Sequence, residues 1–418
     1  MTRLRYLGFT LALGLLCAAP AQADPVSDWN AKAVAAASAS AALGGRAGPP
    51  GLLDLAVVHV AMHDAVQAIQ GRFQPYHYSG PGSGSPAAAA VAAAHRALVL
   101  IYPLQKDGPT GLDAQYDAYL ALHGLVGDPG LAVGEAAALA DYTAHYRPVN
   151  TPASFFGVAE IGQWRSAVAM AFLQLAFETP FTLNRIDQFR PPPPPPMGSM
   201  TYAREYDEVK AKGSILAHPD PHDLLVSPDT EKAWFWSGNF VAQWNETTRQ
   251  LANAHLTDIG DSARLFALVN LAGADAAMAV WDSKYFYNFW RPSTAIQDGS
   301  VDGNPRTDGD GGWAPLLANP AYPDYVSGAN GLTGAFTGTL RDFFGTDDMV
   351  FSVKTTAAKA IDKERDYTSF SQAAQEVVDA RILLGIHFRS ADEEARRLGE
   401  RVSHWTFQKF LRAAPGNK

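Results

Sequence analysis

Apolar residues recur at helical spacing along most of the chain, and this pattern predicts an all-α protein. The spacing is clearest in residues 52–69, where apolar side chains fall three or four positions apart. Runs of alternating β-branched residues, which would predict strands, are scarce. We expect helices over residues 31–43, 52–69, 87–102, 130–146, 160–177, 202–212, 227–244, 262–290, 330–344, 355–367 and 371–386.

Six consecutive prolines, Pro191–Pro196, interrupt the helical pattern. Such a run cannot form a helix or a central strand, so it is expected to be extended. It either links two domains or lies as a strap across one, and the aromatic residues on both sides, which need burial, favour the strap. We therefore divide the chain into an N-terminal helical region (24–190), a strap or linker (191–200) and a C-terminal helical region (201–418).

The first 23 residues have the pattern of a secretory signal peptide. Arg3 and Arg5 precede a short apolar run, 7–17, and residues 21–23 form a small-x-small cleavage site. We expect this segment to be removed and the mature protein to be periplasmic or secreted. No later segment holds 18 uninterrupted apolar residues, so no transmembrane segment is expected in the mature chain.

Composition narrows the possible chemistry. The chain has 418 residues, of which 47% are hydrophobic and 18% charged, so it can bury a core and is not disordered. The formal net charge is −9 and no long basic run occurs, which argues against a nucleic-acid partner. The single cysteine, Cys17, lies in the predicted signal peptide. The mature chain is therefore expected to use no disulfide, thiolate or cysteine-ligated metal.

The segment Lys284–Pro292 places two cations among aromatic residues. A spacing of seven would bring Lys284 and Arg291 nearly into line on one helix. Pro292 disfavours helix at the residue before it, so Arg291 is expected at the helix end. The two cations either pack on the rings in ordinary cation–π contacts or, if buried, need an anionic partner.

Two further segments could bind an anion. Ser327-Gly328 opens a helix-prone stretch and offers a hydroxyl and free backbone N–H groups, although a plain N-cap without a ligand is the alternative. Arg381 and His387 would lie about 120° apart on an unbroken helix. They converge only if the helix breaks at Gly385, and the alternative for His387 is a core role.

Two other motifs favour structural roles. His59 and His63 have the spacing of a metal-binding pair, but no Glu follows the first His and the surroundings are apolar, so core packing is the better interpretation. The Asp308–Gly312 segment lacks the ligand series of a calcium loop and is expected to be a solvated loop.

Three motifs follow one another in a fixed order: Lys-x6-Arg-Pro, Ser-Gly at a helix start, and Arg-x3-Gly-x-His. Together they resemble the vanadium-dependent haloperoxidase and type-2 phosphatidic acid phosphatase superfamily. The segments LAVVHVAMHDAVQAI, QFRPPPPP, WDSKYFYNFWRPSTAI, YPDYVSGAN and GIHFRSADEEA resemble its secreted bacterial haloperoxidase-like branch. The resemblance extends from about residue 29 to 405 and implies a helical-bundle fold.

The resemblance also implies residue roles. The groups that would hold the oxygens of vanadate or phosphate are those of Lys284, Arg291, Ser327, Gly328 and Arg381. Arginine suits this task because its planar fork donates paired hydrogen bonds. His387 would be the axial ligand to vanadium in a peroxidase or the nucleophile in a phosphatase, and both roles need a neutral imidazole nitrogen.

One position departs from the family pattern. The second motif of the family is Ser-Gly-His, and this chain has Ala329 in place of the acid–base histidine. Alanine cannot transfer a proton, and the amide of the adjacent Asn330 does not titrate. Because general acid–base catalysis contributes roughly 10²–10⁴-fold, impaired turnover is expected.

The sequence leaves three functions open. The first is a vanadium-dependent haloperoxidase-like enzyme that uses hydrogen peroxide to oxidise halide to hypohalous acid. The second is a periplasmic acid phosphatase that acts on small phosphoesters with His387 as nucleophile. The third, suggested by Ala329, is a non-catalytic oxyanion-binding protein.

Overall fold

Helices account for almost all regular structure in the computed structural model, which describes residues 24–145, 153–218 and 227–415. The predicted signal peptide, 1–23, lies outside the described residues. The α-helices are α1 (Pro25–Ala37), α2 (Pro49–Gln70), α3 (Pro86–Ile101), α4 (Leu112–His123), α5 (Gly130–His145), α6 (Met200–Lys212), α7 (Pro228–Phe235), α8 (Phe240–His255), α9 (Ile259–Tyr287), α10 (Pro292–Gln297), α11 (Gly328–Phe344), α12 (Phe370–Leu383) and α13 (Arg389–Lys409). The strands are β1 (Phe351–Lys354) and β2 (Glu364–Tyr367), which pair antiparallel. The prediction of an all-α fold is confirmed.

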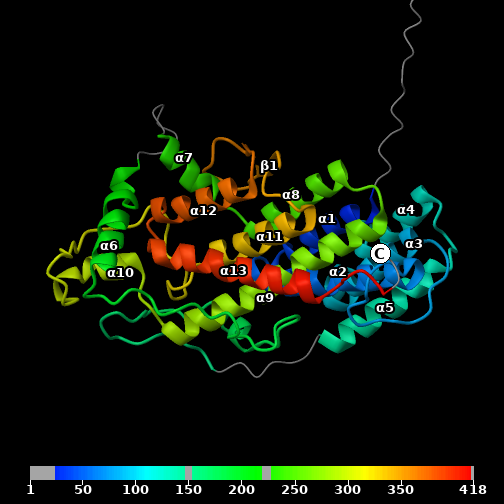
Figure 1. Cartoon of the computed structure of the whole chain (residues 1–418), viewed down its shortest axis with the longest axis horizontal. Coiled ribbons are helices and arrows are strands. Elements are labelled where there is room, and N and C mark those ends of the chain that lie inside the picture. Colours follow the sequence, from blue (N-terminus) through cyan, green and yellow to red (C-terminus); the bar gives the residue numbers. More distant parts are fainter. Residues whose placement is uncertain (1–23, 146–152, 219–226, 416–418) are drawn as a thin grey trace, which may run out of the picture.

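The helix α9 is the central element of the fold. It packs against α2, α11 and α13, which run beside it along the long axis of the molecule (Figure 1). Helices α3, α4 and α5 lie together at one end, and α6 and α10 lie at the other (Figure 1). All α9 residues from Leu265 to Lys284 are buried, so this helix needs apolar or small residues around its whole circumference.

By length and composition alone, α2 and α9 could each cross a membrane, although charged residues interrupt their apolar runs. The most apolar 18-residue window of α2 is 83% buried inside the fold, and that of α9 is 94% buried. The apolar surface of both helices is therefore used for core packing within the chain.

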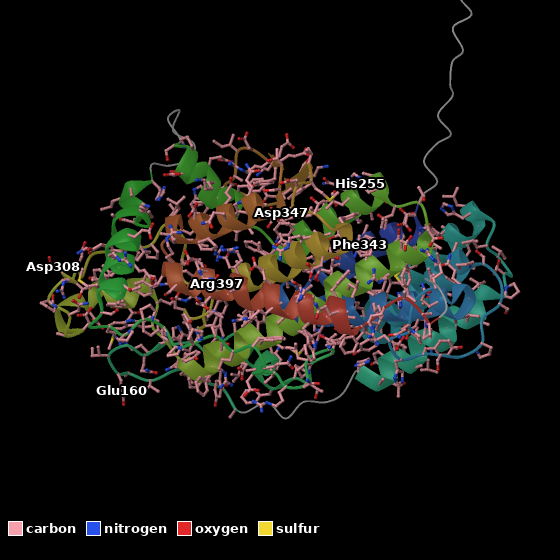
Figure 2. All side chains as sticks on the ribbon, in the orientation of Figure 1. Glu160, His255, Asp308, Phe343, Asp347 and Arg397 are labelled. Atoms are coloured by element: carbon pink, nitrogen blue, oxygen red, sulfur yellow. The ribbon has the colours of Figure 1, made fainter. Side chains whose placement is uncertain are left out.

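The helix predicted over 160–177 is wrong. This segment is irregular apart from a short 3-10 helix, η3 (Leu173–Phe177), and its labelled residue Glu160 lies at the outer edge of the molecule (Figure 2). The backbone has positive φ at Gly162 (84°) and Phe172 (61°), which a continuous helix does not allow. The Trp164 N–H donates to the Asn288 carbonyl oxygen at 2.7 Å, so the segment satisfies its backbone through distant partners.

The helix predicted over 355–367 is also wrong. Its second half forms β2, in register with β1 so that Phe351 lies opposite Tyr367. The two rings stack with centroids 5.7 Å apart, and Phe351 and Val353 alternate with more exposed residues, as a half-buried strand requires. Cross-strand aromatic packing therefore outweighs the helical spacing of this segment.

The remaining differences concern helix ends and helices that were not predicted. The predicted helix over 227–244 is two helices, α7 and α8, separated at residues 236–239. Helix α9 ends at Tyr287 rather than residue 290, and α4 and the long α13 were not predicted. The first two prolines of Pro191–Pro196 accept hydrogen bonds at 2.6 Å from the hydroxyls of Tyr287 and Tyr325, so this extended run lies against the chain near the end of α9.

Candidate functional site

Lys284 lies fully buried in the last turn of α9. Its ammonium donates to the carbonyl oxygens of Pro323 at 2.7 Å and Asp324 at 3.0 Å. The ammonium also lies 4.8 Å from the centre of the Tyr322 ring, within cation–π range. These contacts fix Lys284 against the loop that precedes α11.

Arg291 lies outside α9, and the expectation that it ends that helix is wrong. Asn288, with φ of 46°, ends α9, and the chain turns into an extended link before Pro292 starts α10. Arg291 is extended, with φ −82° and ψ 155°, as expected for a residue before proline. Its Nε donates to the Tyr322 carbonyl at 2.9 Å and its Nη1 to the Ile386 carbonyl at 2.7 Å.

Ser327 and Gly328 open a helix, as predicted. Ser327 is the extended N-cap of α11 and Gly328 is its first residue, and both are buried. The N–H groups of a first helical turn have no partner within the helix, and they carry the positive end of its dipole. Gly328 packs against Trp281, where an added Cβ would lie 3.2 Å from the ring. The start of α11 therefore presents buried N–H groups beside the cations.

Arg381 and His387 converge because the helix breaks, as the sequence predicted. Helix α12 ends at Leu383, and Gly385 adopts φ of 75°, in the left-handed region that glycine favours. The Arg381 Nη1 donates to the Trp236 carbonyl at 3.1 Å. His387 is 1% exposed and reaches Arg291, whose Nη1 lies 3.3 Å from its Nε2.

Asp324 fixes the tautomer of His387. The Asp324 Oδ1 lies 2.6 Å from the His387 Nδ1, and Asp324 is fully buried. An arginine can only donate, so the contact between Arg291 Nη1 and His387 Nε2 makes Nε2 the acceptor. The imidazole proton then lies on Nδ1 and is donated to Asp324. His387 therefore presents an Nε2 lone pair to the cations, as both a metal ligand and a nucleophile require.

Burial and mutual repulsion shift the pKa values of the cluster. Burial lowers the pKa of Lys284 well below its ordinary value, and Arg291 lowers it further. Burial also lowers the pKa of His387 well below its ordinary range, with added repulsion from the three cations, so the imidazole is neutral. Burial raises the pKa of Asp324 to about 7, opposed by Arg291 and Lys284. An anion placed among these cations would relieve their repulsion.

Two buried guanidinium nitrogens of the cluster have no hydrogen-bond partner among the described residues. They are Nη2 of Arg291 and Nε of Arg381, and their residues are 2% and 7% exposed. Leaving a buried donor unpaired costs about 1–3 kcal/mol, and more for a charged group. Together with the start of α11 and the His387 Nε2, these donors fit a tetrahedral oxyanion such as vanadate or phosphate.

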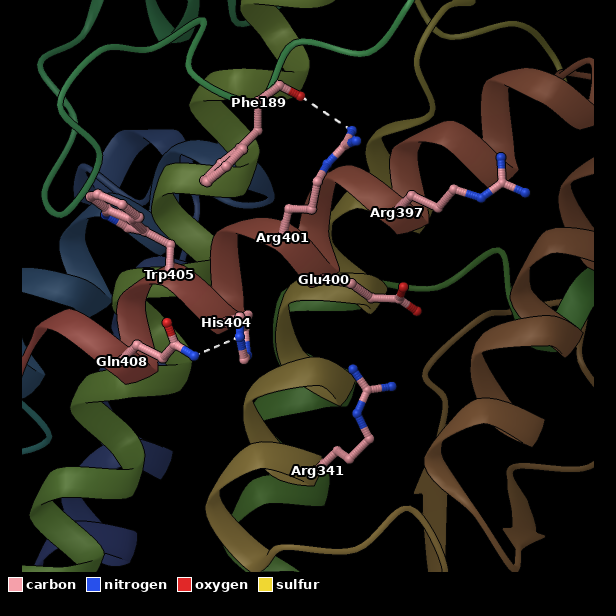
Figure 3. Close-up of a pocket in the computed structure, with 8 residues that line it drawn as sticks. All are labelled: Phe189, Arg341, Arg397, Glu400, Arg401, His404, Trp405 and Gln408. Carbon is pink, nitrogen blue, oxygen red and sulfur yellow. Dashed lines mark hydrogen bonds between the residues drawn. The ribbon is translucent and has the colours of Figure 1, made fainter.

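No acid–base group stands at position 329. Ala329 is a partly buried residue of the first turn of α11, and the amide of Asn330 donates to Asp392 Oδ1 at 2.8 Å. His404 does not replace the missing histidine. It lies on the outer face of α13 in a surface groove, where Gln408 contacts its ring (Figure 3).

The sequence predictions did not include Asp324, Tyr322 and Asp392. The first two stand three and five residues before Ser327, both within the quoted segment YPDYVSGAN. An acidic residue in an aromatic run next to an anion-binding motif was the signal for Asp324. His59 and His63 have core roles: their Nε2 atoms contact Asn30 at 2.8 Å and the Gln74 carbonyl at 3.1 Å.

Comparisons with known proteins show which family and which fold the chain resembles. Residues 264–416 match the family model described as the VCPO second helical-bundle domain. A vanadium chloroperoxidase of Curvularia inaequalis is 36% identical over 114 residues, which are 25% of this chain and 18% of that protein. The chain therefore aligns with less than a fifth of this curated relative.

Solved structures resemble the whole chain. A bacterial vanadium-dependent iodoperoxidase has a TM-score of 0.73 at 20% identity, covering 94% of this chain and 98% of its own. A holo-type bacterial vanadium-dependent chloroperoxidase has a TM-score of 0.66 at 18% identity, covering 89% and 94%. The resemblance in the sequence is thereby confirmed: the chain has the fold of bacterial vanadium haloperoxidases, and residues 264–416 match the model of the VCPO second helical-bundle domain.

Proposed function

We propose that this protein is a vanadium-dependent haloperoxidase-like enzyme that uses hydrogen peroxide to oxidise halide. The observation that carries the proposal is the buried site in which the His387 Nε2 lone pair faces Arg291, while Arg291 and Arg381 each keep an unpaired N–H. The groups proposed to hold vanadate are those of Lys284, Arg291, Ser327, Gly328, Arg381 and His387.

In this proposal the protein residues bind and orient the oxyanion. Arg291 and Arg381 donate N–H groups to its oxygens. Lys284, which is buried away from water, offsets its negative charge. Asp324 accepts the Nδ1 proton of His387, so the Nε2 lone pair would be directed at bound vanadate and could ligate it. Vanadate, when bound, would supply the Lewis acid that activates hydrogen peroxide.

The proposal includes impaired acid–base catalysis. The alanine at position 329 cannot move a proton to or from the bound reactants, so turnover is expected to be lower by part of the roughly 10²–10⁴-fold that a general acid contributes. Binding of the oxyanion does not depend on that residue. Export of the mature chain, from the pattern in residues 1–23, is a further part of the proposal.

A phosphatase is the second candidate, because the same His387 geometry suits a nucleophile. A neutral imidazole oriented by a carboxylate can attack phosphorus as well as ligate vanadium. The same cations would then hold a small phosphoester. In that reaction, too, no histidine at position 329 would be present to protonate the leaving group.

The purified protein, loaded with orthovanadate, tests the proposal through peroxide-dependent oxidation of bromide. Vanadate-dependent turnover that Arg381→Ala abolishes supports the haloperoxidase function, with Arg341→Ala on the surface of α11 as the matched control. Hydrolysis of a phosphate monoester by the vanadate-free protein, lost in His387→Ala, would instead support the phosphatase. Vanadate binding without turnover in either assay would indicate a non-catalytic oxyanion-binding protein.

A further inference from the structure

A second buried carboxyl, Asp392, lies beside the start of α11. It belongs to the first turn of α13 and is fully buried. Its Oδ1 accepts a hydrogen bond from the Asn330 amide at 2.8 Å. Asn330 stands next to Ala329, so Asp392 lies near the position at which the family places its acid–base histidine.

The other oxygen of Asp392 is uncommitted. Both Asp392 Oδ2 and Ser327 Oγ are buried and have no hydrogen-bond partner in the described part of the chain. The Ser327 hydroxyl is nevertheless close enough to the carboxyl to favour its ionised form. Asp392 therefore lies beside Ser327, a residue proposed to hold the oxyanion.

The charges around Asp392 come from four other parts of the fold. The groups that act on it are Lys284 on α9, Arg291 before α10, Asp324 before α11, and Arg381 on α12. Among the described residues, no Lys or Arg nitrogen lies within 4 Å of its oxygens in an ion pair, although Arg381 attracts the ionised form. Burial raises the pKa of Asp392 well above its ordinary value, and Asp324 raises it further.

We infer that Asp392 holds, at Oδ2, the proton that the chain cannot hold at position 329, and that Ser327 Oγ passes this proton to the bound oxyanion. In this transfer the Ser327 hydroxyl gives its proton to an oxygen of the oxyanion and takes the Asp392 proton, so Ser327 stays neutral and Asp392 becomes a carboxylate. The transfer consumes one proton, and a proton from the bulk solvent then restores the neutral Asp392. The inference rests on the proposed function, and Asp392 acts as a positioning residue because it works through Ser327.

A neutral Asp392 also suits the charge of the site. Above about pH 7, where Asp324 is ionised, three cations then face one carboxylate, and a doubly charged oxyanion neutralises the remainder. An ionised Asp392 would repel that oxyanion. Binding is therefore expected to be accompanied by retention or uptake of a proton at Asp392.

The variant Asp392→Asn separates the two roles. Asparagine keeps the acceptor oxygen for Asn330 and imitates the neutral acid, but it has no acidic proton to give. We expect orthovanadate and orthophosphate binding at pH 6 to change less than about threefold, while peroxide-dependent bromide oxidation falls by about 10²-fold. Asp342→Asn alters another contact between α11 and α13, to His404, and is the matched control.

Calorimetry of orthophosphate binding gives a readout that needs no turnover. Titrations in two buffers with different ionisation enthalpies measure the protons taken up, and the wild type should take up more than Asp392→Asn at the high pH values where Asp392 is ionised in the ligand-free protein. The affinity ratio of variant to wild type should rise with pH, because only the wild type must keep a proton.

The double variant with Ala329→His completes the test. A histidine at position 329 would supply the proton by itself, so the cost of Asp392→Asn should fall below about tenfold in that background. Bromide oxidation by Asp392→Asn at the wild-type rate would overturn the inference, as would equal proton uptake by the two proteins at a pH where Asp392 is ionised in the ligand-free wild type. Loss of binding and turnover together with unchanged thermal stability would also overturn it. If the wild type binds phosphate but shows no vanadate-dependent turnover, the proposed function fails while proton uptake still decides the role of Asp392.

Discussion

The His387 Nδ1 lies 2.6 Å from the Asp324 Oδ1, and this contact sets the chemistry of the candidate site. Asp324 stands on the loop before α11, and His387 follows the break after α12. Because the imidazole gives its single proton to Asp324, the opposite nitrogen, Nε2, faces Arg291 with a lone pair. Burial, with added repulsion from the cations Arg291, Lys284 and Arg381, lowers the pKa of His387 well below its ordinary range and keeps the imidazole neutral.

Asp324→Asn is expected to lower oxyanion affinity and turnover by roughly 10–100-fold. The asparagine amide can donate to Nδ1, which would move the imidazole proton to Nε2 and block the lone pair. Nitrogen-detected NMR of labelled histidine measures this tautomer directly. Unchanged Nδ1 protonation in the variant would show that Asp324 does not set the tautomer of His387.

Arg381→Met is expected to separate stability from ligand binding. Burial lowers the pKa of Arg381, and repulsion from Arg291 opposes its charge, so an apolar side chain of similar length should leave the ligand-free protein equally stable or about 1–3 kcal/mol more stable. The stabilisation by orthovanadate, about 2.7 kcal/mol for the wild type at a hundred times Kd, should disappear. Thermal unfolding with and without orthovanadate measures both effects. Arg341→Met is the control, and it should keep the full ligand effect.

Gly385→Ala tests the break that brings Arg381 and His387 together. The left-handed conformation costs a non-glycine residue roughly 1–2 kcal/mol, and a Cβ at this position would lie 2.2 Å from the Gly213 carbonyl oxygen. Gly345 has nearly the same φ, 73°, with no atom within 4 Å of its Cβ position. Urea unfolding should therefore show a larger loss of stability for Gly385→Ala than for Gly345→Ala. Equal losses would mean that the contact with Gly213 adjusts without cost.

The three motifs could be predicted from the sequence because each depends on local backbone chemistry. Ser327 forms an N-cap, Gly385 supplies the left-handed break, and the proline after Arg291 makes that arginine extended. Long buried helices such as α9 were also predictable, because their apolar residues are too many for a surface helix. These features need no information about distant parts of the chain.

The rest depends on contacts between distant segments. An acid in a loop, such as Asp324, is usually solvated, and only the packing of the loop against α9 buries it. The strand β2 forms because Tyr367 meets Phe351, and segment 160–177 is irregular because its backbone bonds to residues more than 100 positions away. For α13 a local signal was present, since Ala391, Ala395, Leu398 and Val402 are buried at helical spacing.

Asp141→Asn is expected to change how stability depends on pH. Burial, with Asp64 nearby, raises the pKa of Asp141 to about 9, and neither carboxyl oxygen has a hydrogen-bond partner in the described structure. The folded protein therefore keeps a proton that the unfolded chain releases above pH 3.8, so stability is lost as pH rises from about 4 towards 9. The variant should lack this loss, which amounts to at most about 1.4 kcal/mol per pH unit.

Urea unfolding at pH 5 and pH 8 measures this difference. The stability of Asp141→Asn relative to the wild type should be higher at pH 8 than at pH 5. Asp117→Asn, at an exposed position on α4, should follow the wild type at both values. A constant difference between Asp141→Asn and wild type would show that Asp141 is ionised in the folded protein.

Ala329→His restores the acid–base residue of the family motif. The position lies in the first turn of α11, directly after the Ser327-Gly328 start, and its side chain is only partly buried, so a larger side chain has room to be accommodated. An acid–base histidine contributes roughly 10²–10⁴-fold, and the gain in bromide oxidation should lie towards the lower limit if Asp392 already supplies a proton.

Steady-state rates as a function of pH measure the gain, which should follow the ionisation of the new imidazole. Ala329→Gln, which adds bulk and a hydrogen-bonding group without a titratable proton, should give no such pH-dependent gain. Equal rates for the histidine and glutamine variants would mean that proton transfer at this position does not limit the reaction.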